Sequence, residues 1–236
     1  MNKNNLKNKL PEWARVNGKF SLVRNKILRN YYYERYNFVS KLLSNDNVSN
    51  LIARKKVLDV GCGVGNFLDI LYKFGFETYG IDFSESAIKK IHKRDAVVRS
   101  YIPPIPFRDS SFDFVVALGF TEHVLNEKNF IEEVYRVIKK NGIYICSIPI
   151  EIGIAGFIRH ITKNIVYRDK SIFDYSIEEI KGKCPREKHG VDHKYYNYKY
   201  LINDLNEYFA SLELYYWPRF LPSMFSPIMF ARCVKL

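Results

Sequence analysis

Residues 57–67 read VLDVGCGVGNF, and the rest of the fold can be worked out from this stretch. It opens with a short run of β-branched and apolar residues, as a buried strand does. Gly61, Gly63 and Gly65 follow, and an apolar pattern of helical period begins directly after them. Glycine tolerates positive φ and lets the backbone approach a ligand closely. The stretch therefore predicts a strand, a glycine turn and a helix, with a ligand bound at the turn.

The alternation of strand and helix continues along the chain. Strands are predicted at 56–60, 77–82, 96–99, 113–118 and 143–148, and helices at 65–74, 84–94 and 126–140. Such alternation indicates a parallel sheet with helices on both faces. Because crossovers are right-handed, the glycine turn should lie at the carboxyl edge of the sheet, beside the switch point where ligands bind.

The two ends of the chain add further elements. A helix is predicted at 20–43, another at 198–209, and two strands at 212–217 and 228–234 that form an antiparallel hairpin. The predicted class is α/β, a Rossmann-like doubly wound sheet that is mostly parallel with an antiparallel C-terminal strand. We expect a helical extension at 1–50 and one domain at 51–236, in which 150–195 is an inserted lid or substrate-binding segment.

A glycine turn of this kind can serve several ligands, because the start of a helix favours any anionic group. A phosphate-binding loop would need a Lys-Ser/Thr pair, which is missing after Gly61. A dinucleotide fingerprint would need a third glycine where this chain has Asn66. Asp59 would repel a pyrophosphate but would suit a ligand with an ammonium group.

VLDVGCGVGNF resembles motif I of the class I S-adenosylmethionine-dependent methyltransferases. Three further segments are similar to motifs of that family and occur in the family's order: YGIDFSESAI, IPFRDSSFDFVVA and IEEVYRVIKKNGIYICSIP. The resemblance covers residues 51–149, with a looser likeness at 193–235. It implies S-adenosyl-L-methionine as the cofactor.

The resemblance also implies roles for individual residues at the glycine turn and on the next strand. The segment from Asp59 to Gly65, including Gly61, Cys62 and Gly63, should wrap the methionine part of the cofactor. Asp82 should accept hydrogen bonds from both ribose hydroxyls, for which a carboxylate is well suited.

The adenine side of the predicted site departs from the family pattern. Phe83 is expected to pack on the adenine face. Tyr101 stands where the family often has an acidic residue, so either Tyr101 or the backbone of Ile102 would contact the adenine amine. Ordinary packing is the alternative role for Phe83 and Tyr101. Leu118, at the end of its strand, completes the predicted cofactor contacts.

Three histidines are candidates for the catalytic base, because an amine or hydroxyl acceptor must lose a proton. His123 follows a strand in GFTEHVL, and its Glu-His-Val segment resembles one in many small-molecule methyltransferases, where it often opens the next helix. His189 and His193 lie in HGVDHKYYNY, within the expected lid. Their spacing matches no strong zinc pattern, so no metal site is predicted.

Composition limits the cellular setting and the partners. The chain has 236 residues and a net charge of +12, without a long basic block, so an anionic partner and a generally basic surface are both compatible with it. The four cysteines are scattered, which favours reduced thiols and a cytoplasmic location. The N-terminus lacks the apolar segment of a secretory signal, and no run approaches the ~18 apolar residues of a membrane span.

The main functional hypothesis is a methyltransferase that acts on a small-molecule, glycan or lipid-linked acceptor, with O-methylation favoured. The apolar stretch FLPSMFSPIMF is compatible with a lipid-linked acceptor and with peripheral membrane contact. The alternatives are an RNA or protein methyltransferase and a non-catalytic S-adenosylmethionine-binding protein. No Asn/Asp-Pro-Pro-Tyr signature for base amines follows the fourth strand, which argues against nucleic acid.

Overall fold

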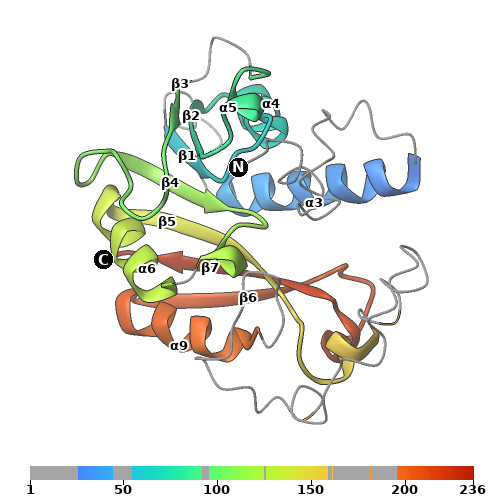
Figure 1. The fold of residues 1–236 in the computed structure, drawn as a ribbon. Helices are drawn as coiled ribbons and strands as arrows, with labels where there is room; N and C mark the ends of the chain where they lie inside the picture. Colours follow the sequence, from blue (N-terminus) through green and yellow to red (C-terminus); the bar gives the residue numbers. More distant parts are fainter. Residues whose placement is uncertain are drawn as a thin grey trace, which may run out of the picture.

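The structure of the protein is a computed structural model. It describes residues 26–44, 55–91, 96–124, 126–158, 161, 181 and 196–236 (Figure 1). The predictions for residues 20–25, for most of the segment 150–195, and for His189 and His193 lie outside the described residues.

A seven-stranded sheet, in the order β3-β2-β1-β4-β5-β7-β6, forms the centre of the molecule. Its strands are β1 (Lys56–Val60), β2 (Glu77–Asp82), β3 (Ala96–Arg99), β4 (Phe112–Ala117), β5 (Ile138–Pro149), β6 (Ser211–Trp217) and β7 (Ile228–Val234). The first five strands pair in parallel, and β7 runs antiparallel to both β5 and β6. The predicted fold class is therefore confirmed.

The strand order reverses next to β1. The chain passes from β1 to β2 and β3 in one direction, and β4 then pairs on the other side of β1. In open α/β sheets this reversal leaves a crevice at the carboxyl ends of the strands, where ligands bind. The glycine turn after β1 lies at this point.

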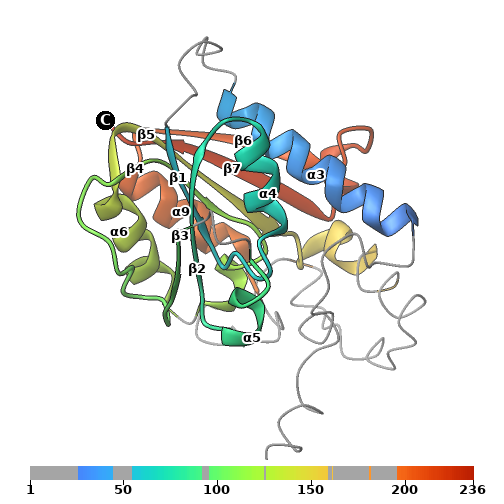
Figure 2. The same ribbon diagram turned by 90° about the horizontal axis from the view of Figure 1, so that it is seen from above.

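Helices cover both faces of the sheet, as Figure 2 shows from above. On one face lie α3 (Lys26–Ser44) and α4 (Asn66–Lys73), and on the other α6 (Glu127–Val137) and α9 (Tyr198–Tyr208). Each pair buries a core of its own against the sheet. Val39, Phe67 and Leu71 belong to the first core, and Phe130 and Leu201 belong to the second.

Short helical turns occupy the connections: α5 (Glu85–Ile88), η2 (Thr121–His123) and η5 (Ser223–Phe225). The helix predicted at 84–94 is shorter than expected, since α5 ends at Ile88. Ser84 caps this helix, with its hydroxyl accepting from the backbone N of Ala87 at 3.3 Å.

The predicted boundary between α6 and β5 was wrong. The helix ends at Val137, and Ile138 already pairs with Phe112 of β4. Backbone N–H groups of Ser110 and Ser111 bind the carbonyls of Arg136 and Val137 at 2.9 and 2.7 Å, so the last helical turn is tied to the chain before β4. Asn141, which follows the predicted helix, takes positive φ within β5 beside a register shift.

Candidate functional site

The glycine turn is held against the end of β2. The backbone N–H groups of Gly61 and Cys62 both donate to the carbonyl of Ile81, at 2.8 and 3.0 Å. Gly61, Gly63 and Gly65 have φ of 76, 53 and 81°, values that other residues adopt only with strain. These positive φ values explain why the sequence places a glycine at every second position here.

The space around Gly61 differs from the space around Gly63. A Cβ on Gly61 would lie 2.5 Å from Cδ2 of Phe120, whose ring comes from the loop after β4. A Cβ on Gly63 would meet nothing within 4 Å. The turn is therefore packed against the protein at Gly61 and leaves room at Gly63.

Asp82 joins the end of β2 to the glycine turn. One carboxylate oxygen accepts from the backbone N of Gly63 at 2.9 Å, and the other accepts from the backbone N of Ser84 at 2.8 Å. These two hydrogen bonds fix the plane of the carboxylate at the carboxyl edge of the sheet. The structure thus brings together the predicted turn and the predicted ribose acceptor.

Asp59 lies beneath the turn, in β1 between Gly80 of β2 and Val116 of β4. Its side chain is only 3% exposed. Burial raises the pKa of Asp59 well above the ordinary value of 3.8, and the nearby charge of Asp82 raises it further. A buried carboxyl group with a raised pKa would be ionised more readily once a cation is bound beside it.

Phe83 and Tyr101 present two aromatic rings beside Asp82. Their side chains are 57% and 75% exposed, and their rings lie 6.2 Å apart at an interplanar angle of 24°. Ile102, the next residue along, is half-buried and packs on the core. Exposed and nearly parallel rings offer stacking faces to a flat heterocycle.

The loop after β4 carries the remaining predicted residues. Leu118 is half-buried, and His123 closes the short helix η2, with its backbone N donating to the carbonyl of Phe120 at 2.9 Å. His123 therefore lies one short turn away from the ring that packs on Gly61. His189 and His193, by contrast, are among the residues that the structure does not describe.

Arg35 and Ser147 also reach this loop, and neither was among the predicted site residues. The Ser147 hydroxyl oxygen accepts from the backbone N of Gly119 at 2.7 Å and from Nη2 of Arg35 at 3.1 Å. Arg35 lies in α3 on the same side as Val39, which is four residues farther along the helix. Arginine is rarely buried, so its residue type did not indicate a site there.

The buried side chains of Tyr196 and Cys146 lie behind η2, on the α6 face of the sheet. Burial raises the pKa of Tyr196, and the carboxyl groups of Glu127 and Glu122 raise it further. Burial likewise raises the pKa of the Cys146 thiol to about 12, so this cysteine is a protonated thiol at neutral pH. Cys62, Cys146 and Cys233 form no disulfide among the described residues.

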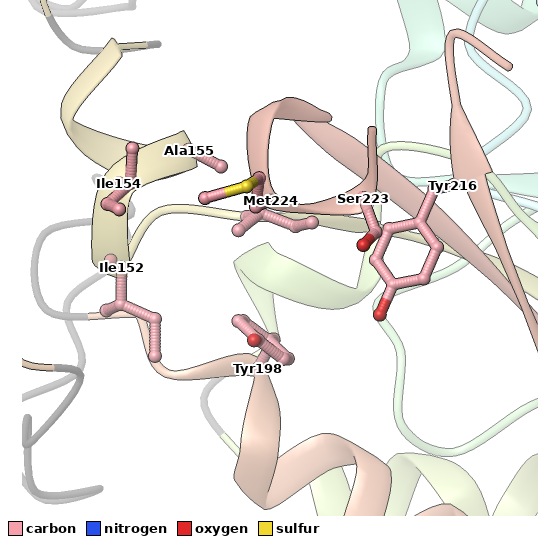
Figure 3. A pocket seen from close by; sticks show the side chains of 9 residues that line it. Ile152, Ile154, Ala155, Tyr198, Tyr216, Ser223 and Met224 are labelled. Atoms are coloured by element: carbon pink, nitrogen blue, oxygen red, sulfur yellow. The ribbon is translucent and has the colours of Figure 1, made fainter. Parts of the chain in front are cut away.

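A hollow of about 250 Å³ lies beside the segment that follows β5, which lines it from Ile150 to Ala155. Figure 3 shows Met224 pointing toward the helical segment 153–158, which carries Ile154 and Ala155. Tyr198 and Tyr216 complete its lining from α9 and β6. Its lining combines apolar side chains with the hydroxyl-bearing Tyr198, Tyr216 and Ser223, and it exposes polar and apolar surface in similar amounts, so it suits an amphipathic group.

Two classes of feature are absent from the part of the chain that is described. The residues within it contain no group of three or more His, Cys, Asp or Glu side chains arranged to hold a metal ion. Within the same ranges, no helix combines the length and the apolar character needed to cross a membrane.

Comparison with known proteins identifies the central part of the chain. A family model described as a methyltransferase domain matches residues 58–146. A probable S-adenosylmethionine-dependent methyltransferase of Mycolicibacterium smegmatis is 27% identical over 123 residues, which is 51% of this chain and 46% of that protein. The ubiquinone biosynthesis O-methyltransferase of Pelagibacter ubique is 32% identical over 140 residues, which is 56% of this chain and 57% of that protein.

A solved structure extends the likeness to the whole fold. The magnesium protoporphyrin IX methyltransferase of Synechocystis, with bound S-adenosylhomocysteine, matches with a TM-score of 0.62 and 15% identity, covering 100% of this chain and 96% of that one. The chain spans about half the length of the curated relatives it matches. Residues 58–146 therefore match a methyltransferase domain, and the predicted resemblance to the class I S-adenosylmethionine-dependent methyltransferases is confirmed.

Proposed function

We propose that this protein transfers a methyl group from S-adenosylmethionine to a small-molecule, glycan or lipid-linked acceptor, with an oxygen atom as the favoured target. The observation that carries the proposal is the carboxylate of Asp82, which hydrogen bonds hold between the glycine turn and the start of α5. The names of the relatives, one of them an O-methyltransferase, support the type of reaction.

The residues at the carboxyl edge fit the parts of this cofactor. The space at Gly63 leaves room for a ligand against the backbone, and Asp82 offers a fixed acceptor to a pair of hydroxyls. Phe83 and Tyr101, with Ile102, would hold the adenine ring. Asp59 would favour the ammonium group from beneath the turn, through the backbone or a water molecule.

The remaining predicted contacts fall on either side of this set. Gly61, Cys62 and Gly65 would contact the methionine part through their backbone, while Leu118 would border it from β4. We place the acceptor on the β5 side of the glycine turn, because the loop after β4 and η2 face that side. His189 and His193, in the segment 150–195, stay candidates for acceptor contact.

The chemistry requires alignment and the removal of a proton. When bound, the cofactor supplies a methyl group made electrophilic by its sulfonium charge. The protein's task is to hold the acceptor oxygen in line with that methyl group. His123, at the carboxyl edge, is the proposed base that takes the acceptor's proton.

The hollow shown in Figure 3 supports a lipid-linked acceptor as one form of the substrate. Its lining includes apolar side chains that stand out from the surface, among them Ile154 and Met224, which are 50% and 54% exposed. An exposed apolar group of this kind favours contact with a hydrocarbon chain or a membrane surface. A cytoplasmic location remains part of the proposal.

The class of acceptor can be tested with methyl-labelled S-adenosylmethionine. The labelled cofactor and the protein are incubated with a cell extract, which is then separated into small-molecule, lipid, RNA and protein fractions. We expect the label in the small-molecule or lipid fraction. Label in RNA or protein would support the alternative acceptors, and no transfer despite cofactor binding would support a non-catalytic protein.

His123→Gln tests the proposed base. We expect turnover to fall by about 10²-fold or more, because general-base catalysis typically contributes that much. Calorimetry should show unchanged affinity for S-adenosylhomocysteine, since His123 is assigned no contact with the cofactor. Normal turnover in this variant would remove His123 from the mechanism.

A further inference from the structure

Arg35 of α3 is a buried cation whose direct contacts among the described residues are with uncharged groups. Its side chain is 8% exposed, and its described contacts are the hydroxyl oxygen of Ser147 and the ring of Phe230, 5.8 Å from the guanidinium carbon. Nε is buried and donates to no partner among the described residues. The described carboxylates form no ion pair with it, although most other described arginines have one.

A charge in this setting is strongly unfavourable unless an anion accompanies it. Transferring a guanidinium out of water has a large free-energy cost. One neutral hydrogen bond and one aromatic contact do not offset that cost. Arginine cannot escape this cost by losing its proton. A buried arginine whose Nε donates to no described group therefore marks a place where an oxyanion would be bound by charge and by hydrogen bonds.

The position of Arg35 connects it to the methyl-transfer site. Nη2 of Arg35 and Oε1 of Glu122 each lie 4.0 Å from the point that a Cβ on Gly119 would occupy. The backbone N of Gly119 shares the hydroxyl of Ser147 with Arg35. Phe120, the next residue, packs on Gly61 of the glycine turn. The guanidinium therefore lies beside Gly119, and the next residue along the chain, Phe120, borders the site proposed for the cofactor.

The side of the sheet on which Arg35 lies separates two sources of an oxyanion. The cofactor carries a carboxylate on its methionine part, which we place over the glycine turn after β1, with Leu118 at the end of β4 on its border. Arg35 instead contacts Ser147 of β5 and Phe230 of β7, which pair with each other in the sheet. Its guanidinium thus lies toward β5 and β7, on the side where we place the acceptor.

We infer that Arg35 and Ser147 form a subsite for an oxyanion, a carboxylate or phosphate, on the methyl acceptor itself. This inference rests on the proposed methyltransferase function and narrows its substrate to acceptors with an acidic group near the methylated atom. In this subsite, Arg35 supplies the charge and Ser147 positions the guanidinium beside Gly119. Glu122 lies across Gly119 from Arg35, and its carboxylate would repel the acidic group of the acceptor and so disfavour binding of that group next to Glu122.

The test uses protein saturated with S-adenosylhomocysteine and two simple anions, sodium benzoate and sodium phosphate, with sodium chloride keeping the ionic strength constant. We expect at least one of the two anions to raise the melting temperature of the wild type. Arg35→Met should weaken that anion's apparent affinity by roughly tenfold or more. Lys41→Met, which removes an exposed cation from the same helix, is the matched control. In this variant the anion should raise the melting temperature as it does in the wild type.

Stability in chloride alone gives a second readout. Arg35→Met removes a buried charge that forms no ion pair with the described residues, so its melting temperature should equal or exceed that of the wild type. A clear drop would show that Arg35 serves the fold and would overturn the inference. A wild type that binds S-adenosylhomocysteine but responds to neither anion would also overturn it.

Affinity for 5′-methylthioadenosine, which lacks the amino-acid carboxylate, separates the two sources of the oxyanion. If Arg35→Met weakens S-adenosylhomocysteine but not 5′-methylthioadenosine, the cofactor's carboxylate is the ligand and the acceptor subsite is overturned. Equal affinities in wild type and variant, for both nucleosides, support the acceptor subsite. Failure of the wild type to bind either nucleoside would instead contradict the proposed function, independently of Arg35.

Discussion

Asp59 carries the most specific information of any residue at the glycine turn. A carboxyl group in the middle of a parallel sheet is unfavourable when ionised, and burial accordingly raises its pKa, with Asp82 raising it further. A ligand with an ammonium group above the turn would favour the ionised form. Cofactor binding should therefore release a proton from Asp59.

The raised pKa of Asp59 makes the stability of the ligand-free protein depend on pH. The folded state holds this proton more tightly than the unfolded chain does, so its contribution to stability is complete below the unfolded pKa, 3.8. The contribution is lost as pH rises toward the folded pKa. Asp59→Asn removes the titration, so the variant should match the wild type near about pH 4 and exceed it near about pH 8.

Thermal unfolding of both proteins across this pH range, without ligand, measures the difference directly. Comparing the two proteins at each pH cancels the other titrating groups that they share. A wild-type advantage that grew with pH would show that the ionised carboxylate stabilises the fold. Calorimetry should also show weaker binding of S-adenosylhomocysteine by Asp59→Asn, since the negative charge is gone.

At the scale of the element, the glycine turn contains two positions with different constraints. Alanine at either Gly61 or Gly63 would adopt positive φ, at a cost of roughly 1–2 kcal/mol. At Gly61 the new methyl group would also collide with the ring of Phe120, 2.5 Å away, and overpacking adds about 1–3 kcal/mol. Gly61→Ala should therefore be the more destabilising substitution in denaturant unfolding.

Gly63→Ala should have the opposite profile, with a modest loss of stability and a large loss of affinity. Its methyl group would enter the space in which we place the cofactor, because no protein atom lies within 4 Å of it. Calorimetry with S-adenosylhomocysteine checks this expectation. Equal loss of stability in the two variants, with affinity intact in Gly63→Ala, would place the ligand elsewhere.

The elements that the sequence predicted correctly have strong local signals, and those it missed do not. Glycine spacing and apolar runs identified the turn, the central strands and α4. The end of α6 depends on hydrogen bonds from Ser110 and Ser111, which are remote in the chain, so the pattern 126–140 could not reveal it. Arg35 was missed for the same reason, since its burial depends on Ser147 and Phe230 of distant strands.

At the scale of the whole molecule, the order of elements was enough to predict the sheet and its switch point. The antiparallel β7 followed from the short connection between two C-terminal strands. The acceptor could not be predicted in the same way. Its site depends on how the N-terminal helix, the loop after β4 and the end of β5 meet, and no single motif encodes such a meeting.

The net charge of +12 is also a property of the whole molecule, and it bears on the RNA alternative. Several cations that the structure describes are engaged by nearby carboxylates, as Lys128 is by Glu207, Lys139 by Asp113 and Arg99 by Glu85. Cations that are already paired contribute less to the binding free energy of an RNA phosphate backbone than an unpaired basic stripe would. We therefore expect RNA binding to be weak and sequence-independent.

Salt separates this expectation from an RNA methyltransferase. Binding of a labelled single-stranded RNA, followed by fluorescence anisotropy, should fall by orders of magnitude between about 50 and 200 mM salt if contacts to phosphates dominate. Methyl transfer to the small-molecule or lipid fraction should change little over that range, because at most one or two charges on the acceptor are involved. Methyl transfer that declined with salt in parallel with RNA binding would identify RNA as the acceptor and contradict the small-molecule proposal.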